Sequence, residues 1–166
     1  MSPVEQLRPT IGWREFIELP ELCSIPIEAK IDTGARTSAL HAHSLGIVSI
    51  DGMEHASFEL HPFVDSETST PRVTIPIVEH RVVTSSNGGR ELRPVIRVAM
   101  ELAGRRQSIL LTLTNRDQMG FAMLVGRSAL GRKFLIDPSQ KHLTRSEPIH
   151  DHSHPVPLTC DSVART

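Results

Sequence analysis

The chain has 166 residues, with 18 Lys and Arg against 19 Asp and Glu and a formal net charge of -1. This length suits one domain, and the scattered basic residues give no electrostatic reason to expect nucleic acid or an anionic membrane as a partner. The N-terminus lacks the basic start and long apolar stretch of a secretory signal, so we expect a cytoplasmic protein. The two cysteines, Cys23 and Cys160, lie far apart, which favours a buried reduced Cys23 over a disulfide framework or a thiolate zinc site.

Frequent breaks favour short strands over long helices, because 12 prolines and 10 glycines interrupt the chain. A mixed apolar pattern at 11–19 predicts a strand that ends before Pro20. The next strand, at 25–31, alternates with period two, so its apolar face carries Ile27, Ala29 and Ile31. This strand runs directly into the sequence Asp32-Thr33-Gly34.

The sequence pattern in the middle of the chain predicts β-hairpins. Residues 39–50 read as extended and are closed by the turn pair Asp51-Gly52, after which 53–61 alternates again. Residues 73–78 resume as a strand that Pro76 confines to an edge or a bulge.

A second turn sequence lies between two apolar segments and consists of Asn87, Gly88 and Gly89. These residues supply the positive φ angles that the tip of a projecting hairpin needs. We expect a flap-like hairpin that closes over an extended substrate, with an ordinary surface hairpin as the alternative.

The sequence of the last part of the domain predicts a pair of strands at 95–102 and 108–114, followed by a short buried strand at 121–125. One short helix at 128–133 and a final strand at 134–136 come after it. The buried strand is wholly apolar and meets Gly126 and Arg127 at its end. We therefore divide the chain into an N-terminal arm (1–10), one β-rich domain (11–143) and a flexible polar tail (144–166).

The turn that follows the first alternating strand can carry chemistry. A buried strand delivers the Asp32 carboxylate from a rigid scaffold, Gly34 lets a partner backbone approach, and the Thr33 hydroxyl can lock the turn. The tripeptide alone also occurs in ordinary turns. Its context here includes the apolar run that ends at Gly126 and leads into a helix.

Together these segments resemble the retropepsins, the half-size aspartic proteases. A closer similarity, over 11–15, 29–42, 113–117 and 123–127, is to a bacterial family labelled ATP-dependent zinc proteases, which is also described as retropepsin-like. The resemblance implies an all-β, retropepsin-like closed β-barrel with one short helix. Some members of that family accompany ATP-grasp ligases that add glutamates to a ribosomal protein.

The resemblance also implies roles for individual residues. It maps the catalytic carboxylate to Asp32, with Thr33 and Gly34 completing the motif. Together with the expected flap, it gives the candidate substrate-binding residues as Ala35, Arg36, Asn87, Gly88, Gly89, Gly126 and Arg127.

One position departs from the retroviral pattern. Retroviral proteases carry a second Asp where this chain has Arg36, and that Asp pairs with the Arg of the Gly-Arg segment. Here we expect Arg36 to face Arg127, and two cations cannot form an ion pair. The retroviral dimer contacts therefore cannot simply be transferred, and Arg36 either faces a substrate carboxylate or is a solvated loop arginine.

Metal and nucleotide chemistry have weaker support. His41 and His43 are two residues apart on an expected strand, so both side chains point to one face and can share a metal with Asp32 or with a distant histidine. No His-Glu-x-x-His element or Walker-type loop is present, so we expect no metal and no cofactor. The alternate histidines at 150–154 are expected to be solvated.

The leading hypothesis is an aspartic-type peptidase that hydrolyses a peptide or glutamyl bond. Its water would be activated by two Asp32 carboxylates, one from each chain of a homodimer, because Asp-Thr-Gly occurs once in the sequence and two adjacent carboxylates share a proton. Two alternatives remain. One is a zinc-dependent peptidase that uses His41 and His43, and the other is a non-catalytic regulatory module that partners a glutamate ligase.

Overall fold

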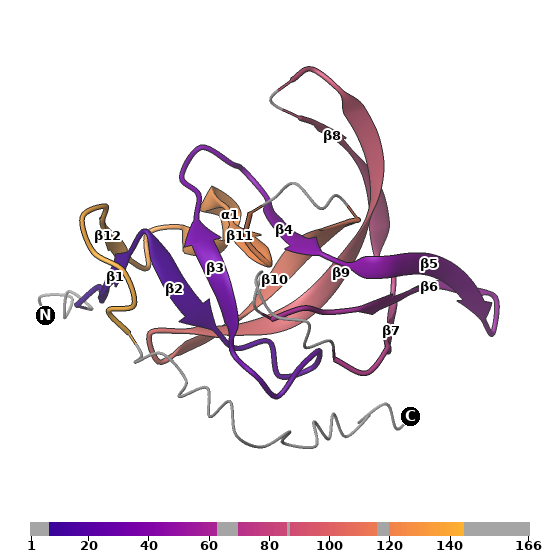
Figure 1. Ribbon diagram of the computed structural model, residues 1–166, viewed down its shortest axis with the longest axis horizontal. Helices are drawn as coiled ribbons and strands as arrows, with labels where there is room; N and C mark the ends of the chain where they lie inside the picture. Colours follow the sequence, from indigo (N-terminus) through magenta and orange to yellow (C-terminus); the bar gives the residue numbers. More distant parts are fainter. Residues whose placement is uncertain (1–6, 63–69, 86, 116–119, 145–166) are drawn as a thin grey trace, which may run out of the picture.

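The computed structural model describes residues 7–62, 70–85, 87–115 and 120–144. These residues form three β-sheets and one short helix, which confirms the expected β-rich fold (Figure 1). The predicted tail, apart from Thr144, lies outside the described residues. The elements are β1 (Thr10–Gly12), β2 (Arg14–Ile17), β3 (Ile27–Ile31), β4 (Ser38–His41), β5 (His43–Ile50), β6 (Met53–Glu59), β7 (Val73–Pro76), β8 (Glu79–Thr84), β9 (Arg90–Leu102), β10 (Arg105–Thr114), β11 (Met123–Val125), α1 (Arg127–Leu130) and β12 (Leu135–Asp137).

The largest sheet has seven strands in the order β2-β3-β11-β4-β10-β9-β8. Its short strand β11 pairs in parallel with β3 and antiparallel with β4, so it is hydrogen-bonded on both sides. The alternation predicted for β3 is confirmed, because the residues of its apolar face are buried: Ile27, Ala29 and Ile31. The apolar composition of β11 agrees with this central position.

The sheet does not close into the expected barrel among the described residues, because its end strands β2 and β8 do not pair. The sheet curls far enough for Glu18, just after β2, to form one antiparallel bridge with Glu101 of β9. Pro20 follows two residues later and has no N–H to donate, so the ladder cannot continue along this segment. The result is a half-closed sheet joined at a single bridge.

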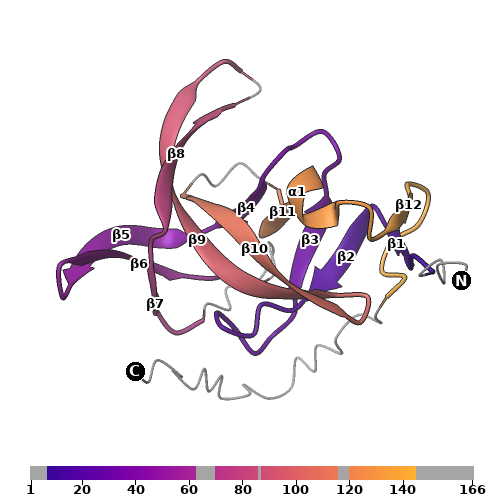
Figure 2. The same cartoon turned by 180° about the vertical axis from the view of Figure 1, so that it is seen from behind.

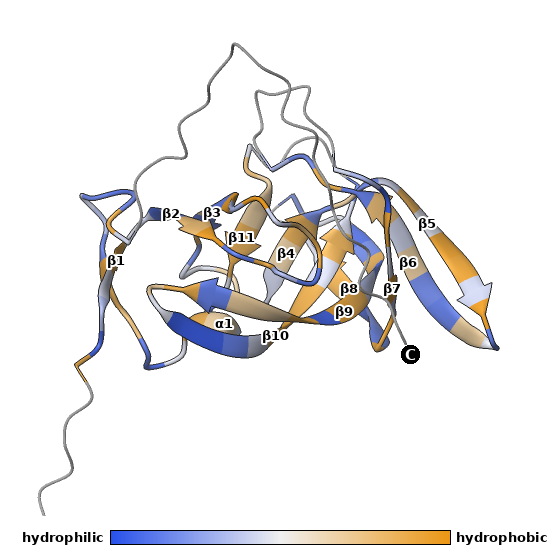
Figure 3. Cartoon of the chain, turned by 90° about the horizontal axis from the view of Figure 1, so that it is seen from below, coloured by the Kyte–Doolittle hydropathy of each residue, from blue (hydrophilic) through white to orange (hydrophobic). Residues whose placement is uncertain are grey.

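The core lies inside this curled sheet. Its largest fully buried side chains include Phe58, Leu40, Ile96 and Leu113, which come from β6, β4, β9 and β10. Figure 3 shows hydrophobic residues along the central strands β4 and β11. Cys23 is buried, as expected. No helix among the described residues is long and apolar enough to span a membrane.

Two hairpins project from this body in different directions (Figures 1 and 2). The first belongs to the three-stranded sheet β5-β6-β7 and turns at Asp51 and Gly52, which have φ angles of +50° and +76°. Pro76 lies on the edge strand β7, as predicted. The second hairpin joins β8 to β9, so both predicted hairpins are confirmed.

The helix is shorter than predicted. It ends at Leu130 rather than Lys133 because Gly131 takes a φ of +52°, a conformation that ends an α-helix. The final strand follows as β12 and pairs in parallel with β1.

A partly buried network of charged side chains holds the segment after β12 against β2 and β3. Glu28 on β3 accepts hydrogen bonds from Arg14 and from His142 Nε2, the latter at 3.0 Å. The His142 ring also stacks on Phe16, with 4.6 Å between ring centroids. Burial raises the pKa of Glu28, but the hydrogen bonds and positive charges of Arg14 and His142 outweigh it, so the pKa lies below the ordinary value of 4.5.

This depressed pKa predicts a pH-dependent contribution to stability. Glu28 stabilises the fold fully above its ordinary pKa of 4.5, and this stabilisation is lost as the pH falls through the lowered folded pKa. Glu28→Gln should lower the free energy of unfolding near neutral pH by about 1 kcal/mol, because partial exposure screens the pair. It should also flatten the decline in stability below pH 4.5. Urea unfolding at several pH values measures both effects, and an unchanged decline would contradict the assignment.

Candidate active site

Asp32 follows directly after β3 and begins a tight turn. Its backbone N–H donates to the carbonyl oxygen of Val125 at 2.9 Å. Its side-chain Oδ1 accepts from the N–H of Gly34 at 3.0 Å, and its carbonyl oxygen accepts from the N–H of Ala35 at 3.2 Å. The carboxylate is therefore oriented by backbone groups while remaining half-buried beside the exposed Thr33 and Gly34.

Gly126, at the end of β11, packs against the loop that follows Asp32. Its N–H donates to Oγ of the fully buried Ser38 at 3.1 Å. A Cβ at position 126 would lie 2.6 Å from the carbonyl carbon of Thr37, closer than real Cβ contacts allow. Glycine is thus the residue that permits this backbone approach.

The start of α1 binds the same loop. The N–H groups of Arg127 and Ser128 donate to the carbonyl oxygens of Ala35 and Arg36 at 2.9 and 3.0 Å. The Arg127 Nη1 donates to the carbonyl oxygen of Thr33 at 2.8 Å. The expectation that Arg36 faces Arg127 therefore needs correction, because the Arg127 guanidinium binds backbone and Arg36 lines a neighbouring hollow.

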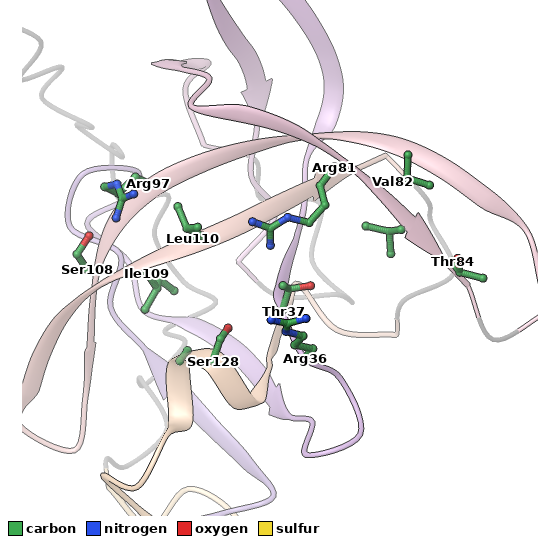
Figure 4. Close-up of a pocket in the computed structure, with 12 residues that line it drawn as sticks. Arg36, Thr37, Arg81, Val82, Thr84, Arg97, Ser108, Ile109, Leu110 and Ser128 are labelled. Atoms are coloured by element: carbon green, nitrogen blue, oxygen red, sulfur yellow. The ribbon is translucent and has the colours of Figure 1, made fainter.

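This hollow has a volume of about 770 Å³ and lies between α1, the loop after Asp32 and strands β8 to β10 (Figure 4). Arg36 and Thr37 line it but Asp32 does not, so it adjoins the turn rather than containing the carboxylate. Sequence reasoning missed two of its arginines, Arg81 and Arg97. The pairing of β8 with β9 and of β9 with β10 brings them together, and no local motif marks either one.

The predicted flap residues lie apart from this unit, at the tip of the β8–β9 hairpin. There the Gly88 N–H donates to the carbonyl oxygen of Ser85 at 2.9 Å, and the Gly89 N–H donates to Oδ1 of Asn87 at 3.2 Å. Gly88 has a φ of +82°, which the turn prediction required. The structure thus leaves these three residues on the hairpin and brings the other predicted site residues together around the Asp32 turn. The residues brought together are Asp32, Thr33, Gly34, Ala35, Arg36, Gly126 and Arg127.

The two histidines proposed as metal ligands lie next to each other. The ring centroids of His41 and His43 are 4.1 Å apart, and His43 also stacks on His61 at 3.6 Å. Within the described ranges no three His, Cys, Asp or Glu side chains are arranged to hold a metal ion. The histidines at 150–154 lie outside those ranges.

A protein-family model described as RimB-like, "Retropepsin-like aspartic endopeptidase RimB", matches residues 10–147. The chain belongs to this RimB-like family. The family description replaces the label of ATP-dependent zinc protease, which no comparison supports. It agrees with the resemblance to retropepsins noted from the sequence.

Curated relatives carry a different name. The chain is 42% identical over 130 residues to a "Probable alpha-L-glutamate ligase" of Shewanella pealeana, and 40% identical over 129 residues to a protein of the same name from Desulfotalea psychrophila. These matches cover 78% of this chain but only 28% of each relative, so the chain spans less than a third of their length.

A solved structure has the same fold. It is the protein Lpg0085 of unknown function (DUF785) from Legionella pneumophila, with a TM-score of 0.64 and 23% identity. The match covers 82% of this chain and 98% of that one.

The close approach at Gly126 predicts a large effect of a small side chain. Gly126→Ala should lower the free energy of unfolding by about 2 kcal/mol or more, because the new methyl group must displace the backbone of Thr37. A matched control is Gly46→Ala, since a Cβ at Gly46 meets nothing within 4 Å. Chemical denaturation of both variants measures the difference. Equal stabilities for the two variants would show that the approach is not constrained.

Proposed function

We propose that this protein is an aspartic-type peptidase whose catalytic carboxylate is Asp32. The observation that carries the proposal is the fixed position of this side chain. It stands at the end of a buried strand, with Oδ1 bound by the N–H of Gly34 and its backbone tied to Val125 of β11. Membership of a family of retropepsin-like aspartic endopeptidases supports the same role.

The chemistry needs a second carboxylate. One chain supplies one Asp-Thr-Gly sequence, so a homodimer with Asp32 of each chain near a two-fold axis would complete the pair. Two carboxylates at contact distance share one proton. The ionised member takes a proton from water as it attacks the scissile carbonyl, and the protonated member donates a hydrogen bond to the carbonyl oxygen. Thr33 and Gly34 hold the turn that presents each carboxylate.

The substrate in this proposal is an extended peptide that lies between the Asp32 turn and the β8–β9 hairpin. Ala35, Arg36, Gly126 and Arg127 would contact it from the turn side, and the hairpin tip with Asn87, Gly88 and Gly89 would contact it from above. The bond is either a main-chain peptide bond or a glutamyl bond. The name of the relatives, probable alpha-L-glutamate ligase, supports an association with a glutamate ligase system.

A second candidate function has its own support. The matched region makes up 28% of the relative from Shewanella pealeana, so in that protein a domain similar to this one belongs to a longer chain named as a ligase. This favours a regulatory module that binds a glutamate ligase and does not itself cleave peptides. Catalysis that depends on Asp32 separates the two functions.

Replacement of the proposed catalytic group provides that test. Asp32→Asn should lower peptide cleavage by about a hundredfold or more, because an amide cannot act as the acid or the base. The matched control Asp51→Asn changes an exposed hairpin turn and should retain full activity. Cleavage of a peptide library, followed by mass spectrometry in the presence of a strong chelator, measures both variants. Equal cleavage by all three proteins would reject Asp32 as the catalytic group, and no cleavage by the unmutated chain would favour the regulatory module.

If the two Asp32 carboxylates of a homodimer act together, an inactive Asp32→Asn chain should lower the activity of the intact chains with which it pairs. Under conditions of subunit exchange, a roughly threefold excess of Asp32→Asn chains leaves about a quarter of the intact chains in intact dimers. Activity per intact chain should therefore fall to about a quarter, since a mixed dimer holds one carboxylate. Exchange is verified independently with differently labelled chains. Unchanged activity after verified exchange would rule out a pair built from two copies of Asp32.

A further inference from the structure

The hairpin of β5 and β6 exposes apolar side chains to solvent: Ile47, Val48, Ile50 and Met53. Val48, Ile50 and Met53 share one face, because Ile50 pairs with Met53 and side chains two residues apart on a strand point the same way. Exposed apolar side chains that gather on one feature mark an interaction surface. Figures 1 and 2 show that this hairpin projects from the body, where another molecule can reach it.

Strand β5 is also an edge strand. The order of its sheet is β5-β6-β7, so β5 pairs with β6 on one side and with no strand of the described residues on the other. Between His43 and Ile50 the strand contains no Lys, Arg, Asp, Glu or Pro, the residues that usually protect an edge against pairing with another chain. A bulge lies between His43 and Gly46, so the regular part of the free edge is 46–50.

The other edge strands that the structure describes are short or carry protecting residues. Strand β7 has four residues and ends in Pro76. Strand β8 carries Glu79 and Arg81, and the four residues of β2 include Arg14 and Glu15. Strands β1 and β12 have three residues each. The contrast indicates that the long, uncharged edge of β5 pairs with another strand.

The turn between β5 and β6 determines which backbone groups of β5 point outward. Ile50 and Met53 flank a two-residue turn, and in such a hairpin the flanking residues form a hydrogen-bonded pair. Hydrogen-bonded and non-hydrogen-bonded pairs alternate along an antiparallel ladder, so Val48 also directs its N–H and C=O toward β6. Ile47 and Ser49 direct theirs outward, and these groups can bind a neighbouring strand.

We propose that the edge of β5 binds a second copy of this chain, with the two β5 strands antiparallel about a two-fold axis at Val48. Pairing would join the two three-stranded sheets into one continuous sheet. The proposal goes beyond the peptidase function and does not depend on it, because it involves neither Asp32 nor the hairpin tip at 85–89.

A second copy fits this edge in register and in charge. With the axis at Val48, residues 46–50 of one copy lie opposite the whole of 46–50 of the other. Ile47 then faces Ser49, so their outward N–H and C=O groups bind one another across the axis. Gly46 faces Ile50, and the missing side chain leaves room for the larger one. The segment is uncharged, so no like charges meet when it faces itself.

Cysteine substitutions test this register in the full-length chain with Cys160→Ser, which leaves only the buried Cys23. Val48→Cys should form disulfide-linked dimers under mild oxidation, because Cα atoms in a non-hydrogen-bonded pair lie about 4.5 Å apart. The matched control is Met53→Cys, since Met53 is 57% exposed on the same hairpin but lies on β6. Cross-linking of Val48→Cys should be about tenfold faster or more, because pairing raises the effective concentration of the thiols.

Variants of the edge test the strand contact itself. Ser49→Pro removes an outward N–H and should slow cross-linking of Val48→Cys by about tenfold, while the β5–β6 ladder keeps its hydrogen bonds. Ile47→Lys should have a similar effect, because it places a charge on the edge of each copy. The matched control is Val78→Lys, since Val78 is 48% exposed against 51% for Ile47 but lies outside β5. It should change the rate by less than about twofold. Circular dichroism melting shows that each variant is folded.

Amide hydrogen exchange separates a second copy from other occupants of the edge. The Ser49 amide should exchange slowly in the concentrated unmutated chain and about tenfold faster or more in Ile47→Lys. Protection of this amide in a chain that sediments as a monomer would assign the edge to another segment of the same chain and overturn the proposal. Fast exchange in the concentrated unmutated chain would leave the edge to a strand of a different protein and also overturn it. Equal cross-linking of Val48→Cys and Met53→Cys would reject the register.

Discussion

The approach of β11 to the loop after Asp32 is the constraint on which the site depends. The carbonyl oxygen of Val125 accepts from the N–H of Asp32, and one residue later Gly126 packs against Thr37 too closely for any side chain at position 126. Because β11 is also paired with β3 and β4, the approach fixes the turn relative to two strands at once. The position of the Asp32 carboxylate is therefore set by backbone geometry, which is stiffer than a contact between side chains.

Local sequence signals predicted the parts of this arrangement that have a short period or a turn requirement. The alternation of β3, the turn at Asp51 and Gly52, and the hairpin tip at Gly88 follow from residues near one another in the chain. Local signals could not predict whether the barrel closes, because closure depends on pairing between strands that are distant in the sequence. In this structure a single bridge, between Glu18 and Glu101, joins them. The hollow was missed for a related reason, since Arg81 and Arg97 meet only through strand register.

This chain has Arg36 at the position where the retroviral pattern has an Asp. The difference changes the role of the arginine in the Gly-Arg segment, Arg127. In the retroviral pattern the arginine of that segment pairs with an Asp at the position of Arg36. In this chain the Arg127 guanidinium instead donates to the carbonyl oxygen of Thr33, so it still braces the Asp32 turn. Arg36 is then left without a carboxylate partner among the described residues, and its side chain contributes positive charge to the hollow. Arg36 thus adds positive charge beside the turn, while Arg127 braces the turn through a backbone contact.

The charge of the hollow also bears on the proposed chemistry. A pair of Asp32 carboxylates that shares one proton carries one negative charge. Nearby cations stabilise such a charge, and their effect falls off over about a Debye length, roughly 8 Å at physiological ionic strength. Arg36 is four residues from Asp32 in the chain and lines the hollow with Arg81 and Arg97, so this side of the turn carries positive charge. High salt would weaken this stabilisation by screening the charges.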